Sequence, residues 1–330
     1  MILVTGGAGF IGSAVARSLL ADGHRIRIAD DLSKGRADSA DELGCEFLHC
    51  DLRRPEDAER ALREVDLCYH LAARIGGITY FHRYPATILS DNNLILTNVF
   101  TAAVRHSTKV VYVSSSMVFE GTNIFPTPES ALARSPLPKS HYGFSKLVGE
   151  YYSSAFHEEW GLKFVICRPF NAYGPGEYPE DEPGLAHVIP DLVKKTLAGD
   201  YPLEIMGSGR QERCFTYVDD VAEAICLAGL DPRAEGEDFN VGLAEPTAIR
   251  ELARLIWERC GRTERFRLRH LPSLPHDIQK RIPDVSKIKN VLGWYPKVTL
   301  SEGLERTIDW YRAHLSSQSQ PRAGSTHLVP

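Results

Sequence analysis

Short runs of apolar and β-branched residues alternate along this chain with longer stretches in which apolar positions recur every three or four residues. The short runs predict strands at Ile2–Thr5, Arg25–Ala29, Glu46–His49, Leu67–His70, Val110–Ser114, Lys163–Cys167 and Phe215–Val218. The longer stretches predict helices at Ile11–Ala21, Pro55–Arg63, Asp91–His106, Tyr142–Glu159 and Val218–Leu227. Such alternation is typical of a parallel sheet with helices on both faces, so we expect a doubly wound α/β fold.

The pattern changes after Arg168, where proline and glycine become frequent, and later helices are expected only at Ile249–Cys260 and Leu300–His314. The strand at Phe215 is expected to return to the sheet. We therefore predict a sheet domain of residues 1–168 plus about 212–242, a smaller α+β domain of residues 169–211 and 243–315, and a disordered tail of residues 316–330. A ligand should bind in the cleft between the two domains.

The charge and cysteine content narrow the class of partner. The net charge of −5 gives no basic excess, which argues against nucleic acid or an anionic membrane as the partner. No apolar stretch reaches the length of a membrane-spanning helix. The seven cysteines are spread singly without metal-ligand spacing, so we expect free thiols, no metal site and a cytoplasmic protein.

A glycine-rich turn joins the first predicted strand to the first predicted helix. Gly6, Gly9 and Gly12 are spaced three apart, and Phe10 and Ile11 open the helix. Glycines at this place let the backbone approach a pyrophosphate, and the helix N-terminus attracts its negative charge. The turn therefore predicts a dinucleotide-binding site of the Rossmann type, although a tight turn without a ligand is the alternative.

Acidic residues follow the second and third predicted strands. A carboxylate at Asp30 can accept hydrogen bonds from both adenosine ribose hydroxyls, which favours NAD over NADP. Lys34 and Arg36 keep NADP open as the less favoured cofactor. Asp51 and Leu52 are candidates for a contact with adenine, and a helix cap is the other interpretation of Asp51.

Tyr142 and Lys146 lie four residues apart and therefore on one helix face. The ammonium of Lys146 can lower the pKa of the Tyr142 phenol, which can then exchange a proton with a substrate hydroxyl during hydride transfer. With the upstream serine-rich segment, this pair resembles the extended short-chain dehydrogenases/reductases that act on nucleotide sugars. The resemblance implies that Ser115 is the third catalytic residue and that NAD is the cofactor.

Further segments resemble the same family and imply roles for their residues. His70–Ala73, the helix from Asp91 and the segment Arg168–Pro175 are the most specific of these. The resemblance assigns cofactor contacts to Leu71, Ala72, Ala73, Asn93, Ser114 and Pro169. It assigns contacts with a nucleotide-diphosphate sugar to Gly77, Ser116, Met117, Asn171, His187, Val188, Arg213 and Arg281, of which the two arginines would bind the diphosphate.

Met117 narrows the range of reactions that the resemblance allows. Sugar 4,6-dehydratases of this family carry an Asp–Glu pair where this chain has Ser116 and Met117, and a thioether can neither donate nor accept a proton. The cysteine that the GDP-mannose 3,5-epimerases and GDP-fucose synthases place nearby is also missing. The remaining chemistry is hydride transfer, which predicts C4 epimerisation through a transient 4-keto sugar with enzyme-bound NAD.

Alternatives remain open. They are a GDP-sugar 3,5-epimerase in which His187 transfers a proton, a keto-sugar reductase or dehydratase, and, remotely, a non-catalytic dinucleotide sensor. The segment Ala73–Ile78 and the motif His187–Pro190 resemble GDP-sugar enzymes, so GDP is slightly favoured over UDP. In this family the helices that carry Asn93 and Tyr142 form a dimer interface, so a homodimer is expected.

Overall fold

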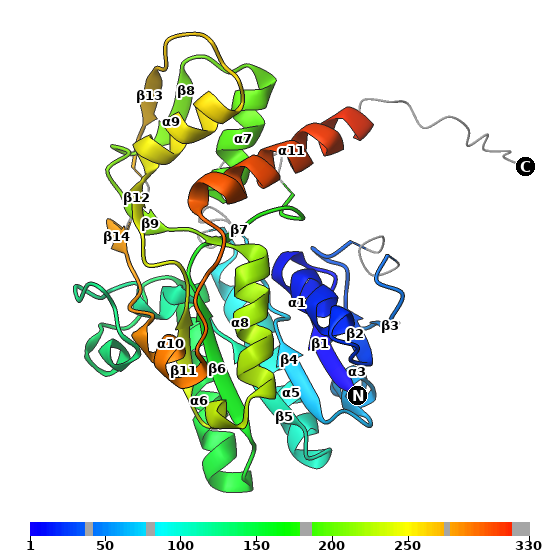
Figure 1. Cartoon of the computed structure of the whole chain (residues 1–330). Helices are drawn as coiled ribbons and strands as arrows, with labels where there is room; N and C mark the ends of the chain where they lie inside the picture. Colours follow the sequence, from blue (N-terminus) through cyan, green and yellow to red (C-terminus); the bar gives the residue numbers. More distant parts are fainter. Residues whose placement is uncertain (37–41, 77–82, 179–186, 274–277, 319–330) are drawn as a thin grey trace, which may run out of the picture.

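The computed structural model describes residues 1–36, 42–76, 83–178, 187–273 and 278–318, and it confirms the expected α/β fold (Figure 1). Seven parallel strands form the main sheet in the order β11-β6-β5-β4-β1-β2-β3. Their bounds are β1 (Ile2–Thr5), β2 (Ile26–Asp30), β3 (Glu46–His49), β4 (Leu67–His70), β5 (Lys109–Val113), β6 (Phe164–Pro169) and β11 (Asp238–Val241). The strand order reverses beside β1, which places the glycine-rich turn at the point where such sheets bind their ligands.

Helices cover both faces of this sheet. One face carries α1 (Phe10–Ala21) and α8 (Val218–Leu230), and the other carries α3 (Pro55–Leu62), α5 (Pro85–Arg105) and α6 (His141–Trp160). Successive residues of β1 point into different layers, because Leu3 packs with the α3/α5 core and Val4 with the α1/α8 core. Burial on both faces explains why these strands are apolar throughout rather than alternating.

The seventh strand is a correction to the sequence-based expectation. The Phe215 segment does not enter the main sheet: β10 (Thr216–Tyr217) pairs with β7 (Ala172–Tyr173) in a separate two-stranded sheet. The edge position belongs instead to β11, whose sequence Asp238-Phe239-Asn240-Val241 is half polar. The polar residues made this segment look unlike a buried strand. They can occupy one because partners distant in the sequence bind them: Arg168 pairs with Asp238, and Glu129 accepts the backbone N–H of Asn240.

A smaller lobe stands on the carboxyl edge of the sheet (Figure 1). Its own core joins α7 (Val188–Ala198), α9 (Ile249–Arg259) and α11 (Leu300–Gln318) with the parallel pair β8 (Leu203–Met206) and β13 (Leu268–Leu271). Below it, β9 (Glu212–Cys214) lies between β12 (Pro246–Ala248) and β14 (Lys280–Arg281). Short helices complete the described chain: η1 (Ser116–Phe119), η2 (Glu129–Arg134), η3 (Pro232–Ala234) and α10 (Ser286–Leu292).

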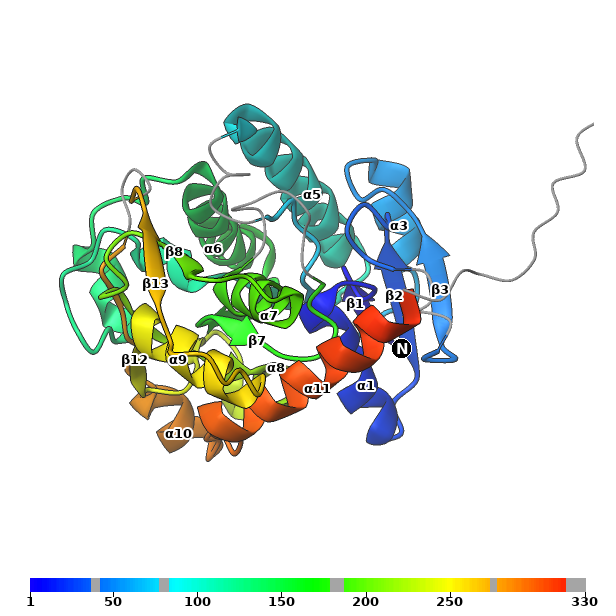
Figure 2. The ribbon, with the colours of Figure 1, turned by 90° about the horizontal axis from the view of Figure 1, so that it is seen from above.

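Helix α11 is longer than expected. It continues to Gln318, so the first residues of the predicted disordered tail are helical, and residues 319–330 lie outside the described part of the chain. Seen from above, α11 runs from the lobe across the sheet edge toward α1 (Figure 2). The last helix of the lobe thus reaches the cofactor half of the molecule.

None of the helices in the described part of the chain is long and apolar enough to cross a membrane. All seven cysteines are free thiols. Within the described ranges, no group of histidine, cysteine and carboxylate side chains is arranged to hold a metal ion.

Candidate active site

The structure brings the three predicted catalytic residues together where β5 meets α6. Ser115 follows β5 and caps η1, with its Oγ accepting a hydrogen bond from the Met117 amide at 3.2 Å. Ser140 caps α6 in the same way, because its Oγ accepts the Gly143 amide at 3.1 Å. Two capped turns therefore fix the serine and Tyr142 relative to each other.

Tyr142 is buried, with Ile88, Met117 and Ile278 packed around it. Burial raises the pKa of Tyr142 to about 12, while a hydrogen bond with Ser115 and the charge of Arg281 oppose the rise. The phenol is therefore protonated at neutral pH in this structure and can donate to an oxygen placed between it and Ser115. To accept a proton it needs nearby positive charge.

Lys146 supplies that charge. It is buried one turn from Tyr142, its Nζ donates to the carbonyl oxygen of Val113 at 2.8 Å, and it lies 6.0 Å from the Tyr142 ring. Burial lowers the pKa of Lys146 to about 8, with Glu150 acting in the opposite direction. At neutral pH the ammonium is protonated and has donors left for ribose hydroxyls.

The glycine-rich turn has the close approach that a dinucleotide requires. Gly6 has a φ of +68° and packs against the backbone of Ala72, so a Cβ there would lie 2.9 Å from the Ala72 nitrogen. A Cβ on Gly12 would lie 2.1 Å from the Gly6 oxygen. Helix α1 then begins at Phe10 and Ile11 with an open N-terminus, because the capping residue Gly9 has no side chain. This turn fits a pyrophosphate at its helix end.

Asp30 ends β2 beside this turn. Its two carboxylate oxygens accept the amides of Ala8 at 3.0 Å and Leu32 at 2.9 Å, and burial raises its pKa. The carboxylate thus fixes the glycine loop and retains lone pairs for a ribose. Asp51 accepts hydrogen bonds from Arg53, and the Leu52 side chain is buried in the core, so their contact with adenine stays a prediction.

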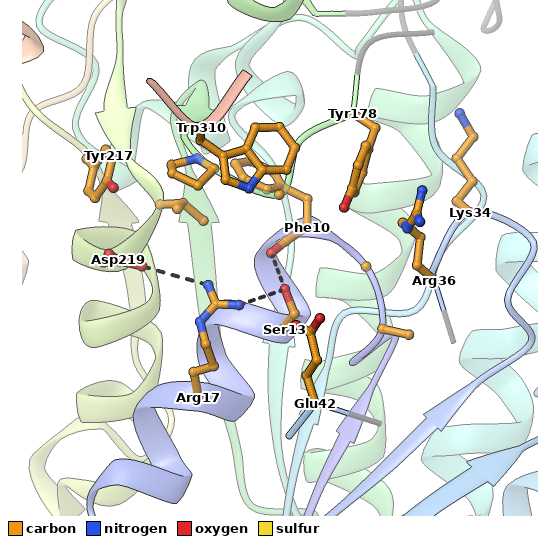
Figure 3. Close-up of a pocket in the computed structure, with 15 residues that line it drawn as sticks. Phe10, Ser13, Arg17, Lys34, Arg36, Glu42, Tyr178, Tyr217, Asp219 and Trp310 are labelled. Atoms are coloured by element: carbon orange, nitrogen blue, oxygen red, sulfur yellow. Dashed lines mark hydrogen bonds and ion pairs between the residues drawn. The ribbon is translucent and has the colours of Figure 1, made fainter. Parts of the chain in front are cut away.

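A cavity of 310 Å³ opens at the glycine loop (Figure 3). Gly9 and Phe10 form one side of it, with Lys34 and Arg36 beside them. No sequence pattern predicted its other side, where Tyr178 lies between Arg36, at 4.5 Å, and Trp310 of α11, at 5.1 Å. The cavity, the glycine turn and Asp30 together fit a dinucleotide such as NAD, which would supply a hydride acceptor near Tyr142.

A water-sized cavity lies beside Lys146. Ala72, Ala73 and Asn92 help to line it. The Nδ2 of Asn92 donates to Ser145 at 3.0 Å, and its Oδ1 accepts the Arg74 amide at 2.7 Å. The predicted Asn93 is not among the lining residues, because its neighbour Asn92 occupies the face of α5 that is turned toward Ser145 and Lys146.

Four predicted cofactor residues make contacts within the protein itself. The Ser114 hydroxyl donates to Glu150 at 2.6 Å, and its contact with the cofactor stays a prediction. The amides of Leu71 and Ala72 donate to the Thr5 hydroxyl, both at 3.2 Å. Pro169 ends β6 opposite Val241.

The predicted substrate residues form a linked group. Asn171 donates to the Cys214 carbonyl oxygen at 2.8 Å and accepts from Arg281 at 3.2 Å, so it positions the arginine rather than pointing its amide at the sugar. Arg281 also lies 2.8 Å from the Met117 sulfur. The expectation that Arg281 binds a diphosphate therefore needs its side chain to move, because here the guanidinium lies at the reacting end.

The remaining substrate residues are placed as follows. Arg213 is the β9 neighbour of Arg281, and its guanidinium donates to backbone carbonyls, including that of Glu212 at 2.9 Å. Ser116 is buried at the start of η1. Val188 is partly buried at the start of α7. Gly77 lies outside the described residues.

His187 precedes α7 and hydrogen-bonds to Glu177, a buried carboxylate that the sequence did not reveal. Burial lowers the pKa of His187 and the carboxylate of Glu177 raises it. The carboxylate prevails, so the pKa is raised. Glu177 in turn accepts a hydrogen bond at its backbone oxygen from Tyr311 of α11. The pair lies at the edge of the site and can hold a proton near neutral pH.

The chain is similar to known proteins over most of its length. A model described as the NAD dependent epimerase/dehydratase family matches residues 2–242. A UDP-glucose 4-epimerase of Mycolicibacterium smegmatis is 34% identical over 94% of this chain and 98% of its own. A UDP-N-acetyl-alpha-D-glucosaminuronate decarboxylase of Bacillus cytotoxicus is 33% identical, covering 94% and 97%.

Solved structures agree with these relatives. The crystal structure of a UDP-glucose 4-epimerase from Thermotoga maritima with UDP-glucose superposes with a TM-score of 0.87 at 33% identity, over 95% of this chain and 99% of the other. All three named relatives are UDP-sugar enzymes.

Proposed function

This chain belongs to the NAD-dependent epimerase/dehydratase family, and we propose that it is a nucleotide-sugar C4 epimerase that works through a transient 4-keto sugar. The family is NAD-dependent and its fold is the one observed, so the cofactor and fold expected from the sequence are confirmed. Bound NAD supplies reversible hydride transfer at the sugar carbon. The residues of this chain bind the sugar, orient it and move the hydroxyl proton.

The single observation that supports C4 epimerisation is the Ser115–Tyr142–Lys146 set, in which the tyrosine and the lysine are buried and a non-ionisable residue, Met117, lies beside them. Tyr142 accepts the proton of the C4 hydroxyl and returns it after the keto sugar has turned over. Ser115 holds the oxygen, and the ammonium of Lys146 stabilises the phenolate. Met117 fills the position from which a carboxylic acid would act on a neighbouring carbon, so loss of water from the sugar is disfavoured.

We propose UDP as the nucleotide, ahead of GDP. The resemblance to GDP-sugar enzymes depends partly on Gly77, which lies outside the described residues, and on the His187 motif. The three relatives named above carry UDP in their names.

A second candidate is decarboxylation of a nucleotide-linked uronic acid. The guanidinium of Arg281 lies against Met117 and acts electrostatically on Tyr142, so it can neutralise a carboxylate at the reacting end. A 4-keto uronate is a β-keto acid, which loses carbon dioxide readily once its charge is held. The Bacillus relative is named for this type of reaction.

The test is incubation of the full-length protein in D₂O with UDP-glucose, UDP-N-acetylglucosamine, UDP-glucuronate or GDP-mannose, followed by proton NMR. C4 inversion without deuterium at C3 or C5 supports the proposal. Carbon dioxide and a pentose product from UDP-glucuronate would establish the second candidate. A 4-keto-6-deoxy product would contradict both, and deuterium at C3 or C5 of an epimerised hexose would favour a 3,5-epimerase.

We also propose that the protein is a cytoplasmic homodimer. Helices α5 and α6 pack side by side and expose large apolar residues, Leu94 at 47% and Tyr151 at 69%. A second copy would cover these side chains, and the free thiols fit a reducing compartment. Light scattering after gel filtration checks the mass, and a monomer at micromolar concentration would contradict the dimer.

A further inference from the structure

Helix α6 carries a buried carboxylate, Glu150, one turn beyond Lys146, and the reaction proposed above gives it no role. Arg168 of β6 binds it bidentately, with Nε to Oε1 and Nη2 to Oε2 both at 2.8 Å. Arg168 is itself buried, and its Nη1 pairs with Asp238 of β11 at 2.7 Å. A carboxylate fixed by two parallel hydrogen bonds cannot turn away from its neighbours.

Glu150 and Lys146 bind consecutive residues of one strand end. The Lys146 ammonium donates to the carbonyl oxygen of Val113 at 2.8 Å, and the Ser114 hydroxyl donates to Glu150 at 2.6 Å. Ser115 follows at once. The carboxylate, the lysine and the catalytic serine are therefore all attached to the same end of β5.

The other groups packed around Lys146 carry no negative charge at neutral pH. His70 of β4 is buried, and its pKa is lowered to about 3, so it is neutral. Burial holds the pKa of Tyr112 of β5 well above 10 and raises that of Tyr142 to about 12. Among the described residues facing Lys146, Glu150 is thus the anion, and it opposes the effect of burial on the lysine.

We propose that Glu150 is a positioning residue: clamped by Arg168, it supplies the charge that keeps the buried Lys146 ammonium protonated, and through Ser114 it fixes the strand end that carries Ser115. The consequence for catalysis rests on the function proposed above. The consequence for the lysine does not, because it follows from the buried charges alone.

The test measures Lys146 directly. Full-length protein labelled with [ε-¹³C]lysine is titrated by NMR, and the Lys146→Met variant assigns the resonance. We expect a midpoint near 8 in the unaltered chain, and a midpoint lower by roughly one unit or more in Glu150→Gln, since a neighbouring charge is worth about that much. Glu150→Asp should restore part of the shift. An unchanged midpoint in Glu150→Gln would overturn the proposal.

Two further variants separate charge from folding. Glu223→Gln removes a surface carboxylate that pairs with Lys297 and should leave the Lys146 midpoint in place. If Glu150→Gln does not fold, Glu150→Gln with Arg168→Gln removes both buried charges together, which costs less than leaving one unpaired. Because Arg168→Gln also removes a positive charge, the double variant is compared with Arg168→Gln alone, and equal Lys146 midpoints in those two proteins would equally refute the idea.

Kinetics then test the catalytic consequence. With a UDP-sugar that the enzyme turns over, the alkaline limb of kcat should move to lower pH in Glu150→Gln by the same amount as the NMR midpoint. A uniform loss of kcat with an unmoved limb would mean a structural role only. If no sugar is turned over by the unaltered enzyme, the proposed function fails, while the NMR titration still decides the role of Glu150.

Discussion

The two sides of the candidate site differ in how they are built. The cofactor side, made by the glycine turn, Asp30 and the Tyr142 helix, is held by contacts within and between neighbouring sheet elements. The substrate side is assembled from segments far apart in sequence, as when Arg281 meets Asn171 and Met117. The difference indicates that the proton-transfer groups depend on the sheet and its helices, whereas the groups at the substrate end depend on contacts between distant segments.

The largest expected effect concerns the cofactor side of the site. Tyr142→Phe removes the hydroxyl that exchanges the proton and keeps the buried ring, so kcat should fall by about 10²–10⁴-fold, as for loss of a general acid–base. NAD binding, measured by calorimetry, should stay within a few-fold because Lys146 is retained. Steady-state rates close to those of the unaltered enzyme would exclude Tyr142 as the proton-transfer group.

The next effect concerns packing in the glycine turn, on the same side of the site. Gly12→Ala places a methyl group 2.1 Å from the Gly6 oxygen, a backbone atom that cannot yield without moving the turn. Overpacking of this kind costs about 3 kcal/mol in the free energy of unfolding, visible as a lower midpoint in denaturant. Gly9→Ala, whose Cβ would lie 3.2 Å from the same oxygen, is the matched control and should lose much less. Equal losses would show that the turn is looser than the structure indicates.

The same contrast explains what the sequence could predict. The glycine turn, Asp30 and the Tyr142–Lys146 pair are local patterns in which each residue's role depends on near neighbours, and the structure brings them together as expected. The prediction of Asn93 was wrong by one position, because the sequence does not show which of the adjacent Asn92 and Asn93 the packing of α5 turns toward Ser145. Ser114 and Asn171 are bound by Glu150 and Cys214, partners that no local pattern reveals. β11 was missed for the same reason, since distant Arg168 satisfies its charge.

A smaller effect tests the substrate side. Arg281→Gln removes a charge from the reacting end, and a charge-assisted contact contributes about 2 kcal/mol, or roughly 30-fold in kcat/KM. Arg213→Gln, on the neighbouring strand, is the comparison. If Arg281 holds a sugar carboxylate, its variant should lose more on UDP-glucuronate than on UDP-glucose, whereas Arg213→Gln should lose equally on both. Equal losses of kcat/KM for both variants on both sugars would indicate that Arg281 binds the diphosphate instead.

The smallest effect lies where the two sides touch. Trp310 of α11 belongs to the lobe, Arg36 belongs to the loop after Asp30, and Tyr178 lies between them (Figure 3). Ring and cation–ring contacts of this kind contribute about 1 kcal/mol. Trp310→Ala removes the contact on the lobe side, so the loop beside the cofactor should open more readily and NAD should dissociate roughly 5-fold faster.

The measurement is the loss of bound NAD after rapid dilution, followed by absorbance of the released cofactor. Trp160→Ala provides the control, because Trp160 is a half-exposed tryptophan that packs on Phe156 at the far end of α6. Its variant should release NAD at the unaltered rate. Should Trp310→Ala also release NAD at that rate, the stack would merely cover the cavity, and retention of the cofactor would depend on the glycine turn and Asp30 alone. A faster release confined to Trp310→Ala would instead mean that the lobe also governs how long the cofactor stays bound.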